Sequence, residues 1–164
     1  MKKAILLSFF LTFYFSVQIV AQTTTDGKTT QKTTENDVKK SVNPDSLFKT
    51  RIENKEYEVW LEINFYDNNV IVPGQGVLGA LPGYMGAKKD GRTWLITDAE
   101  IIDRHTATLT FINDYGSEDL TAELSINPDG TYVLTQKEGS TIKFAFKNKW
   151  VKLPKRLTFT RPAK

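Results

Sequence analysis

The chain has 164 residues, a formal net charge of +3 and no cysteine. Its length suits one folded domain. The lack of cysteine excludes disulfides, thiolate metal sites, cysteine nucleophiles and lipid attachment at cysteine, so an apolar core must hold the fold together.

The first 21 residues have the layout of a secretory signal peptide. Lys2 and Lys3 precede an apolar stretch from Ala4 to Phe15, and small residues end the segment at Ala21. This stretch is shorter than the ~20 residues of a membrane helix, so an uncleaved anchor is only the alternative. We expect a periplasmic or secreted protein that has no transmembrane segment after signal cleavage.

Cleavage after Ala21 would remove two lysines and no acidic residue, which lowers the net charge to +1. A global affinity for nucleic acid or membranes is then not expected.

Residues 22–42 follow the cleavage site, with seven threonines and almost no apolar side chains. Such a segment cannot offset the entropy of ordering, so we interpret it as a disordered linker, either a plain spacer or a carrier of sugars.

Residues 43–164 are predicted to form a single β-barrel-like domain. Asn43 and Pro44 offer an N-cap and a first helical position, and a short helix over 44–54 would place three apolar residues on one face. These residues are Leu47, Phe48 and Ile52.

After the helix the apolar period changes to two, which predicts strands. In 57–66 the odd positions Val59, Leu61, Ile63 and Phe65 share one face, and Trp60 lies on the other. Further strands are predicted at 70–72, 93–97, 99–103, 106–112, 120–126, 131–136, 141–147 and 156–161. The ranges 93–97 and 99–103 could also be one strand with a kink at Asp98. The turns between the later strands are short enough to join only antiparallel neighbours.

This series predicts an all-β fold. Eight or nine strands in up-and-down order, apolar on one face, cannot stay a flat sheet, because one short helix is too small to cover that face. Curling into a lipocalin-like barrel buries the apolar face and removes the exposed edges. The alternatives are a two-layer sandwich and a curved sheet covered by a helix.

Residues 74–79 read GQGVLG and match the dinucleotide-binding pattern GxGxxG. That motif needs a helix at its second glycine, but Pro82 and Gly83 follow too soon. We interpret the stretch from Gly74 to Gly91 instead as a long glycine-rich loop with apolar side chains over the open end of the barrel. It would either plug that end or line an apolar ligand site with Leu78, Leu81, Tyr84 and Met85, together with an inward Trp60 or Trp94.

Enzymatic residues are scarce. His105 is the only histidine and lies in a predicted turn, and no serine has a GxSxG setting. Asp98, Glu100 and Asp103 could serve a carboxylate-based hydrolase, which stays a minor alternative. We therefore predict no catalytic residue and no cofactor. We also predict no metal, because the acidic turn over 113–119 lacks the spacing of a calcium loop.

The C-terminal part is basic. From Lys143 to Lys164 there are eight basic residues and no acidic one. A patch of Lys147, Lys149, Lys152, Lys155 and Arg156 could face an anionic surface such as lipopolysaccharide, with Trp150 at the interface. The alternative is a solvated face that guards a sheet edge.

The leader ends in VAQ, the spacer is threonine-rich, and the segments over 81–86 and 149–161 read LPGYMG and KWVKLPKRLTFTR. In these features the chain resembles small secreted or periplasmic domains of unknown function from Bacteroidota-type bacteria. The resemblance covers about 43–162. It implies a periplasmic β-rich domain without an assigned activity, and it implies no functional residue.

The function expected from the sequence is non-enzymatic binding by an exported monomer. One hypothesis is a small apolar or amphipathic ligand held in the barrel mouth. The other is a protein or cell-envelope interaction module whose barrel is filled by its own side chains. Nucleic acid is not an expected partner.

Overall fold

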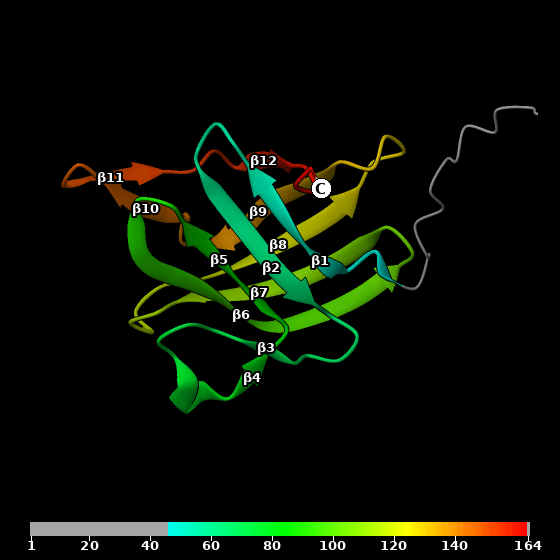
Figure 1. Ribbon diagram of the computed structural model, residues 1–164, viewed down its shortest axis with the longest axis horizontal. Coiled ribbons are helices and arrows are strands. Elements are labelled where there is room, and N and C mark those ends of the chain that lie inside the picture. The colour runs from blue at the N-terminus through cyan, green and yellow to red at the C-terminus, as the bar shows by residue number, and fades with distance from the viewer. Residues whose placement is uncertain (1–45, 164) are drawn as a thin grey trace, which may run out of the picture. The chain divides into compact units, whose positions relative to one another are not determined.

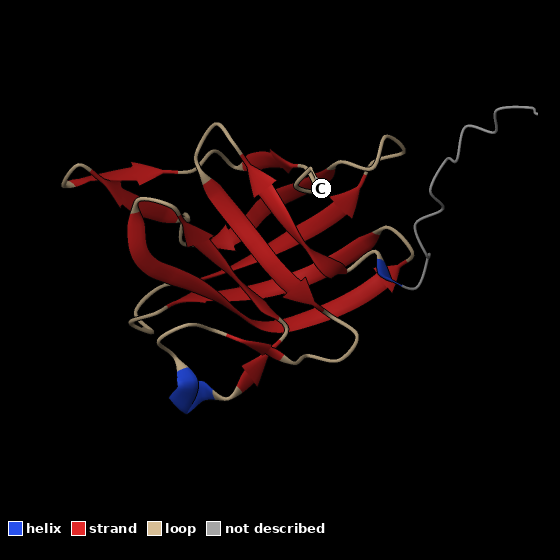
Figure 2. Cartoon of the chain, in the orientation of Figure 1, coloured by secondary structure: helices blue, strands red, loops and turns tan. Residues whose placement is uncertain are grey.

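The computed structural model describes residues 46–163, and in this part of the chain the fold is all-β. Figure 2 shows that strands make up nearly all of the regular structure, with helical geometry only in short turns. These strands confirm the predicted all-β class. The predicted signal peptide, the threonine-rich linker and the first residues of the predicted helix lie outside the described residues.

One antiparallel sheet of eight strands dominates the fold (Figure 1). Its neighbours follow sequence order: β1 (Lys49–Asn54), β2 (Val59–Asn64), β5 (Gly83–Ala87), β6 (Asp90–Asp103), β7 (Thr106–Asn113), β8 (Asp119–Ile126), β9 (Tyr132–Gly139) and β12 (Arg156–Phe159). Two hairpins interrupt the series as separate small sheets: β3 (Val70–Ile71) with β4 (Ala80–Leu81), and β10 (Lys143–Phe146) with β11 (Lys149–Lys152). A 3-10 turn at Gly76–Leu78 joins β3 to β4.

The two ends of the large sheet meet, so the sheet is nearly closed into a barrel. Glu53 and Thr160 exchange backbone hydrogen bonds of 2.8 and 2.9 Å. The Asn54 amide also donates to the Thr158 carbonyl at 2.8 Å. These contacts satisfy backbone groups that the edges of an open sheet would expose.

Side chains of the protein itself occupy the inner face of this sheet. The predicted inward residues of β2 and its extension are buried, namely Val59, Leu61, Ile63 and Phe65. From the later strands Phe111, Leu124, Phe144 and Phe159 are fully buried in the same apolar cluster. Alternation along each strand explains this packing, because every second residue points inward.

The predicted helix over 44–54 is wrong for the residues that the structure describes, because Lys49–Asn54 is strand β1. Phe48 and Ile52 are four apart, and this spacing fits one face of a helix and also one face of a strand. Pairing with β2 decides between them. Ile52 lies opposite Leu61, and the Phe48 ring stacks on that of Phe65 with centroids 5.6 Å apart.

The predicted glycine-rich loop is also corrected. Its second half, GYMGA, is β5, an inner strand of the large sheet between β2 and β6. Here glycine allows close approach: a side chain at Gly83 would collide with the Glu62 carbonyl, and one at Gly86 with the Trp60 ring. Glycine in this segment therefore marks tight packing inside a sheet.

The alternative of a single strand kinked at Asp98 is confirmed: 93–97 and 99–103 both belong to β6, which has a register shift between Ile96 and Asp98. Two further strand predictions differ from the structure. The return strand at 70–72 pairs with β4, not with β2. The range 141–147 does not join the meander, because Lys143–Phe146 pairs with Lys149–Lys152, which the sequence predicts as loop.

Candidate functional site: the basic hairpin

The residues predicted to line an apolar ligand site do not form one site, because they divide between two apolar clusters and the surface. Met85 and Trp94 are buried in the core. Trp60, Leu81 and Tyr84 belong to a second apolar cluster with Val72 and Leu95, and Leu78 is 49% exposed. Because Tyr84 and Met85 are neighbours on one strand, they point to opposite faces of the sheet.

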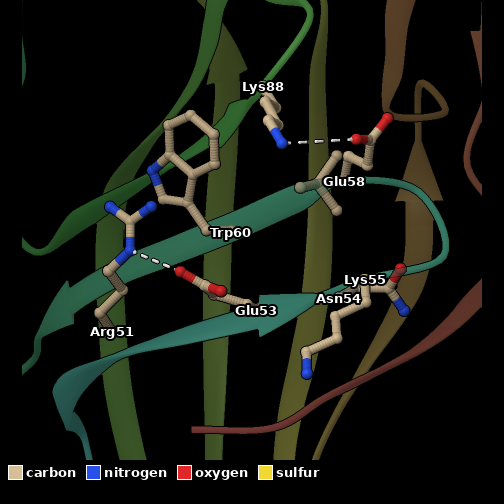
Figure 3. A pocket seen from close by; sticks show the side chains of 8 residues that line it. Arg51, Glu53, Asn54, Lys55, Glu58, Trp60 and Lys88 are labelled. Atoms are coloured by element: carbon tan, nitrogen blue, oxygen red, sulfur yellow. Dashed lines mark hydrogen bonds and ion pairs between the residues drawn. The ribbon is translucent and has the colours of Figure 1, made fainter. Parts of the chain in front are cut away.

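The pocket beside Trp60 is mainly polar, although the ring also packs against the second apolar cluster (Figure 3). A pocket of about 350 Å³ lies beside it, and charged side chains form much of the lining. Arg51 stands 4.6 Å from the Trp60 ring centroid and pairs with Glu53 at 3.1 Å, while Glu58 pairs with Lys88 at 3.9 Å. The ring thus has a guanidinium as its neighbour, which gives little support to an apolar ligand there.

The hairpin of β10 and β11 gathers the predicted basic patch. It projects from the large sheet at the left of Figure 1. Its two-residue turn has positive φ at both Lys147 (49°) and Asn148 (63°), the geometry of a type I′ turn. In the part of the chain that the structure describes, five exposed cations on or just after this hairpin have no carboxylate within 4.0 Å: Lys147, Lys149, Lys152, Lys155 and Arg156.

The same hairpin carries an exposed tryptophan, whose ring contacts two further cations that are themselves ion-paired. Trp150 is 57% exposed, with the Arg92 guanidinium 4.2 Å and the Lys143 ammonium 5.3 Å from its ring centroid. Tyr115, 74% exposed, lines the same small hollow as Trp150. Trp, Tyr and Arg are the residue types that most often dominate binding energy in protein interfaces. The exposed aromatic centre and cationic rim together suit an anionic partner.

Asp90 fixes the hairpin to the barrel. Its carboxylate accepts hydrogen bonds from the Ala145 amide at 2.5 Å and from Arg92 Nε at 2.8 Å. Burial alone would raise the pKa of Asp90, but these hydrogen bonds and the charge of Arg92 outweigh burial and hold the pKa below its ordinary value of 3.8. The hairpin is also anchored by Phe144, which is fully buried.

We expect Asp90→Asn to lower the free energy of unfolding at neutral pH by about 1–3 kcal/mol, because charge-assisted hydrogen bonds are lost. A lowered carboxyl pKa contributes stability above the unfolded-state value, and this stability disappears as the pH falls through the folded-state value. The gap in unfolding free energy between wild type and variant should therefore close below pH 3.8. Denaturant unfolding from pH 7 to pH 3 checks this, and a gap independent of pH would contradict the role of the Asp90 charge.

The residues weighed for catalysis are spread over the surface. His105 is exposed in the turn after β6, where its amide donates to Asp103 Oδ1 at 2.7 Å. Asp98 lines a pocket of about 290 Å³ with Glu123 and Lys137, which pair with each other at 3.3 Å. Among residues 46–163 no group of three His, Asp or Glu side chains is placed to hold a metal ion.

Asp90, Arg92 and Tyr115 were missed by the sequence reasoning. Asp90 and Arg92, at the start of β6, contact the hairpin, and Tyr115, in the turn after β7, lines the same hollow as Trp150. All three are far from the hairpin in sequence. The available signal was the DGR triplet at 90–92, which reads as an ordinary turn. Only the fold brings it beside β10.

No family model, no curated protein and no solved structure matches the chain. In residues 46–163 there is no helix with the length and apolar character needed to cross a membrane.

Proposed function

We propose that the protein is an exported interaction module, periplasmic or secreted, that docks an anionic partner through the β10–β11 hairpin. Its barrel is filled by its own side chains, so binding uses the outer surface. We also propose that the barrel is of the lipocalin-like kind. The up-and-down order of the eight strands in the large sheet supports this.

The observation that carries the proposal is the set of five unpaired cations on or just after the hairpin that holds Trp150. Several lysines elsewhere in the described part of the chain pair with carboxylates: Lys49 with Asp67 at 2.8 Å, and Lys137 with Glu123 at 3.3 Å. The five cations on or just after the hairpin have no such partner and lie within ten residues of one another. Like charges at this density repel one another, and an anionic partner relieves that repulsion.

Rigidity supports the same proposal. The hairpin has a buried Phe144 at its base, the Asp90 carboxylate on its β10 side and a 2.8 Å backbone bond from Leu153 to Ile142 beyond its end. A surface held in this way loses little conformational entropy on binding. A ligand in the barrel mouth has less support, because Met85 and Trp94 pack into the core. A hydrolase has less support too, because Asp98, Glu100 and Asp103 all lie at exposed positions.

Poly-L-glutamate is a suitable probe of this proposal, with poly-L-lysine as the control polymer. We expect the protein to bind poly-L-glutamate at low salt, and the affinity to fall steadily as salt screens the charges. Poly-L-lysine should not bind. Calorimetric titration over a salt series measures both. Failure to bind poly-L-glutamate at any salt concentration would contradict the proposed function.

A further inference from the structure

Strand β11 has one open edge. On the opposite side of the hairpin, the Ala145 amide donates to Asp90, so the backbone groups of Ala145 point away from β11. In an antiparallel pair, residues directly opposite each other either exchange both bonds or turn both sets of backbone groups outward. Trp150 lies opposite Ala145. Its N–H and C=O therefore point away from β10, toward the open edge.

The next outward pair gives the same result. The Lys143 carbonyl accepts a bond from Trp94 Nε1 at 3.2 Å, so it too points away from β11. Lys152 lies opposite Lys143 and must turn its backbone groups to the open edge. Within residues 46–163 the backbone groups of Trp150 and Lys152 have no hydrogen-bond partner across that edge. Donors and acceptors alternate along it at strand spacing.

The charges around this edge select what can pair with it. Lys149 and Lys152 stand at the two ends of β11, and Lys147 is in the turn. A second copy of β11 would bring lysine against lysine, which disfavours self-association. An acidic strand meets the opposite condition, because its carboxylates would lie beside unpaired ammonium groups. Trp150 adds exposed apolar area next to the same edge.

From the outward backbone groups and the unpaired lysines, we infer that β11 accepts an extended, acidic segment of a partner protein as an added strand. The inference rests on the proposed function and names the partner of that site. Strand addition takes its affinity from main-chain hydrogen bonds and its specificity from neighbouring side chains. An anionic lipid surface would use the lysines but would leave the N–H and C=O groups of Trp150 and Lys152 without a partner strand.

The test uses a capped synthetic peptide, Thr-Glu-Val-Thr-Glu-Thr, whose glutamates are spaced like Lys149 and Lys152. Two further forms carry N-methyl groups on alternate amides, one form on the odd residues and the other on the even residues. Only one set of amides can face β11, so one methylated form should lose about 10-fold or more in affinity and the other should bind like the parent. Equal binding of all three forms would overturn strand addition and leave the proposed function standing.

Two protein variants test the same edge. Lys152→Pro removes both the charge and the outward N–H, and proline is tolerated on an edge strand at such a position. Lys152→Gln removes only the charge. Strand addition predicts weaker peptide binding for Lys152→Pro than for Lys152→Gln, and equal affinities would contradict it. If Lys152→Pro does not fold, the methylated peptides decide.

Vesicles of phosphatidylglycerol and phosphatidylcholine complete the experiment. Binding to these vesicles without binding to the peptide would overturn the protein partner in favour of a lipid surface. Failure of poly-L-glutamate to bind overturns the proposed function itself. The two failures are therefore distinguishable.

Discussion

Replacing Lys149 and Lys152 together by glutamate is expected to weaken binding to poly-L-glutamate strongly. Each exposed attraction is worth about 0.2–1 kcal/mol, and reversal turns each attraction into a repulsion of similar size. Loss of both contacts should lower the affinity at low salt by ~100-fold. The effect should shrink as salt rises, because both side chains are exposed. Calorimetric titration of wild type and variant at low and high salt measures it.

The matched control is the pair Lys55→Glu and Arg104→Glu. Both side chains are exposed, both lie away from the hairpin, and neither has an ion-pair partner within residues 46–163. The two double variants change the net charge by the same amount. Equal losses of affinity would mean that only net charge matters, and the basic hairpin would then not be the binding site.

Phe111→Ala is expected to destabilise the fold more than any surface change. Phe111 is fully buried on β7 among the aromatic and aliphatic side chains that fill the barrel. Truncating a buried phenylalanine costs about 3–5 kcal/mol, a large part of the ~5–15 kcal/mol that stabilises a typical domain. Denaturant unfolding checks the value. Phe111→Leu, which keeps more of the volume, should cost much less.

A small effect of Phe111→Ala would show that the barrel interior is not tightly packed. A loss below about 1 kcal/mol would mean that Phe111 borders a space able to hold solvent or a ligand. The ligand hypothesis drawn from the sequence would then gain support at the expense of the hairpin. The unfolding experiment thus bears on function as well as stability.

The fold was predictable where the apolar pattern has a single interpretation. Alternation over 57–66, 106–112 and 120–126 predicted β2, β7 and β8 and the side that each buries, and these predictions are confirmed. The spacing of Phe48 and Ile52 suits both helix and strand, so β1 could not be separated from a helix without its partner β2.

The candidate site was predictable only in part. Its lysines and Trp150 were visible as a basic, tryptophan-bearing tail, but the Lys147–Asn148 turn carries no glycine to mark a hairpin. The Asp90 contact with Ala145 spans 55 positions in sequence and depends on the closure of the sheet. The glycines of 83–86 misled in the other direction, because glycine signals both loops and tightly packed strands.

The most direct test of the account is a map of the amide chemical shifts of the protein during titration with poly-L-glutamate. We predict that the largest changes fall on β10, β11 and Arg92, and that Met85, Phe111 and other interior residues stay unchanged. Changes centred on the interior residues, or spread evenly over all exposed lysines, would contradict a filled barrel that binds through its basic hairpin.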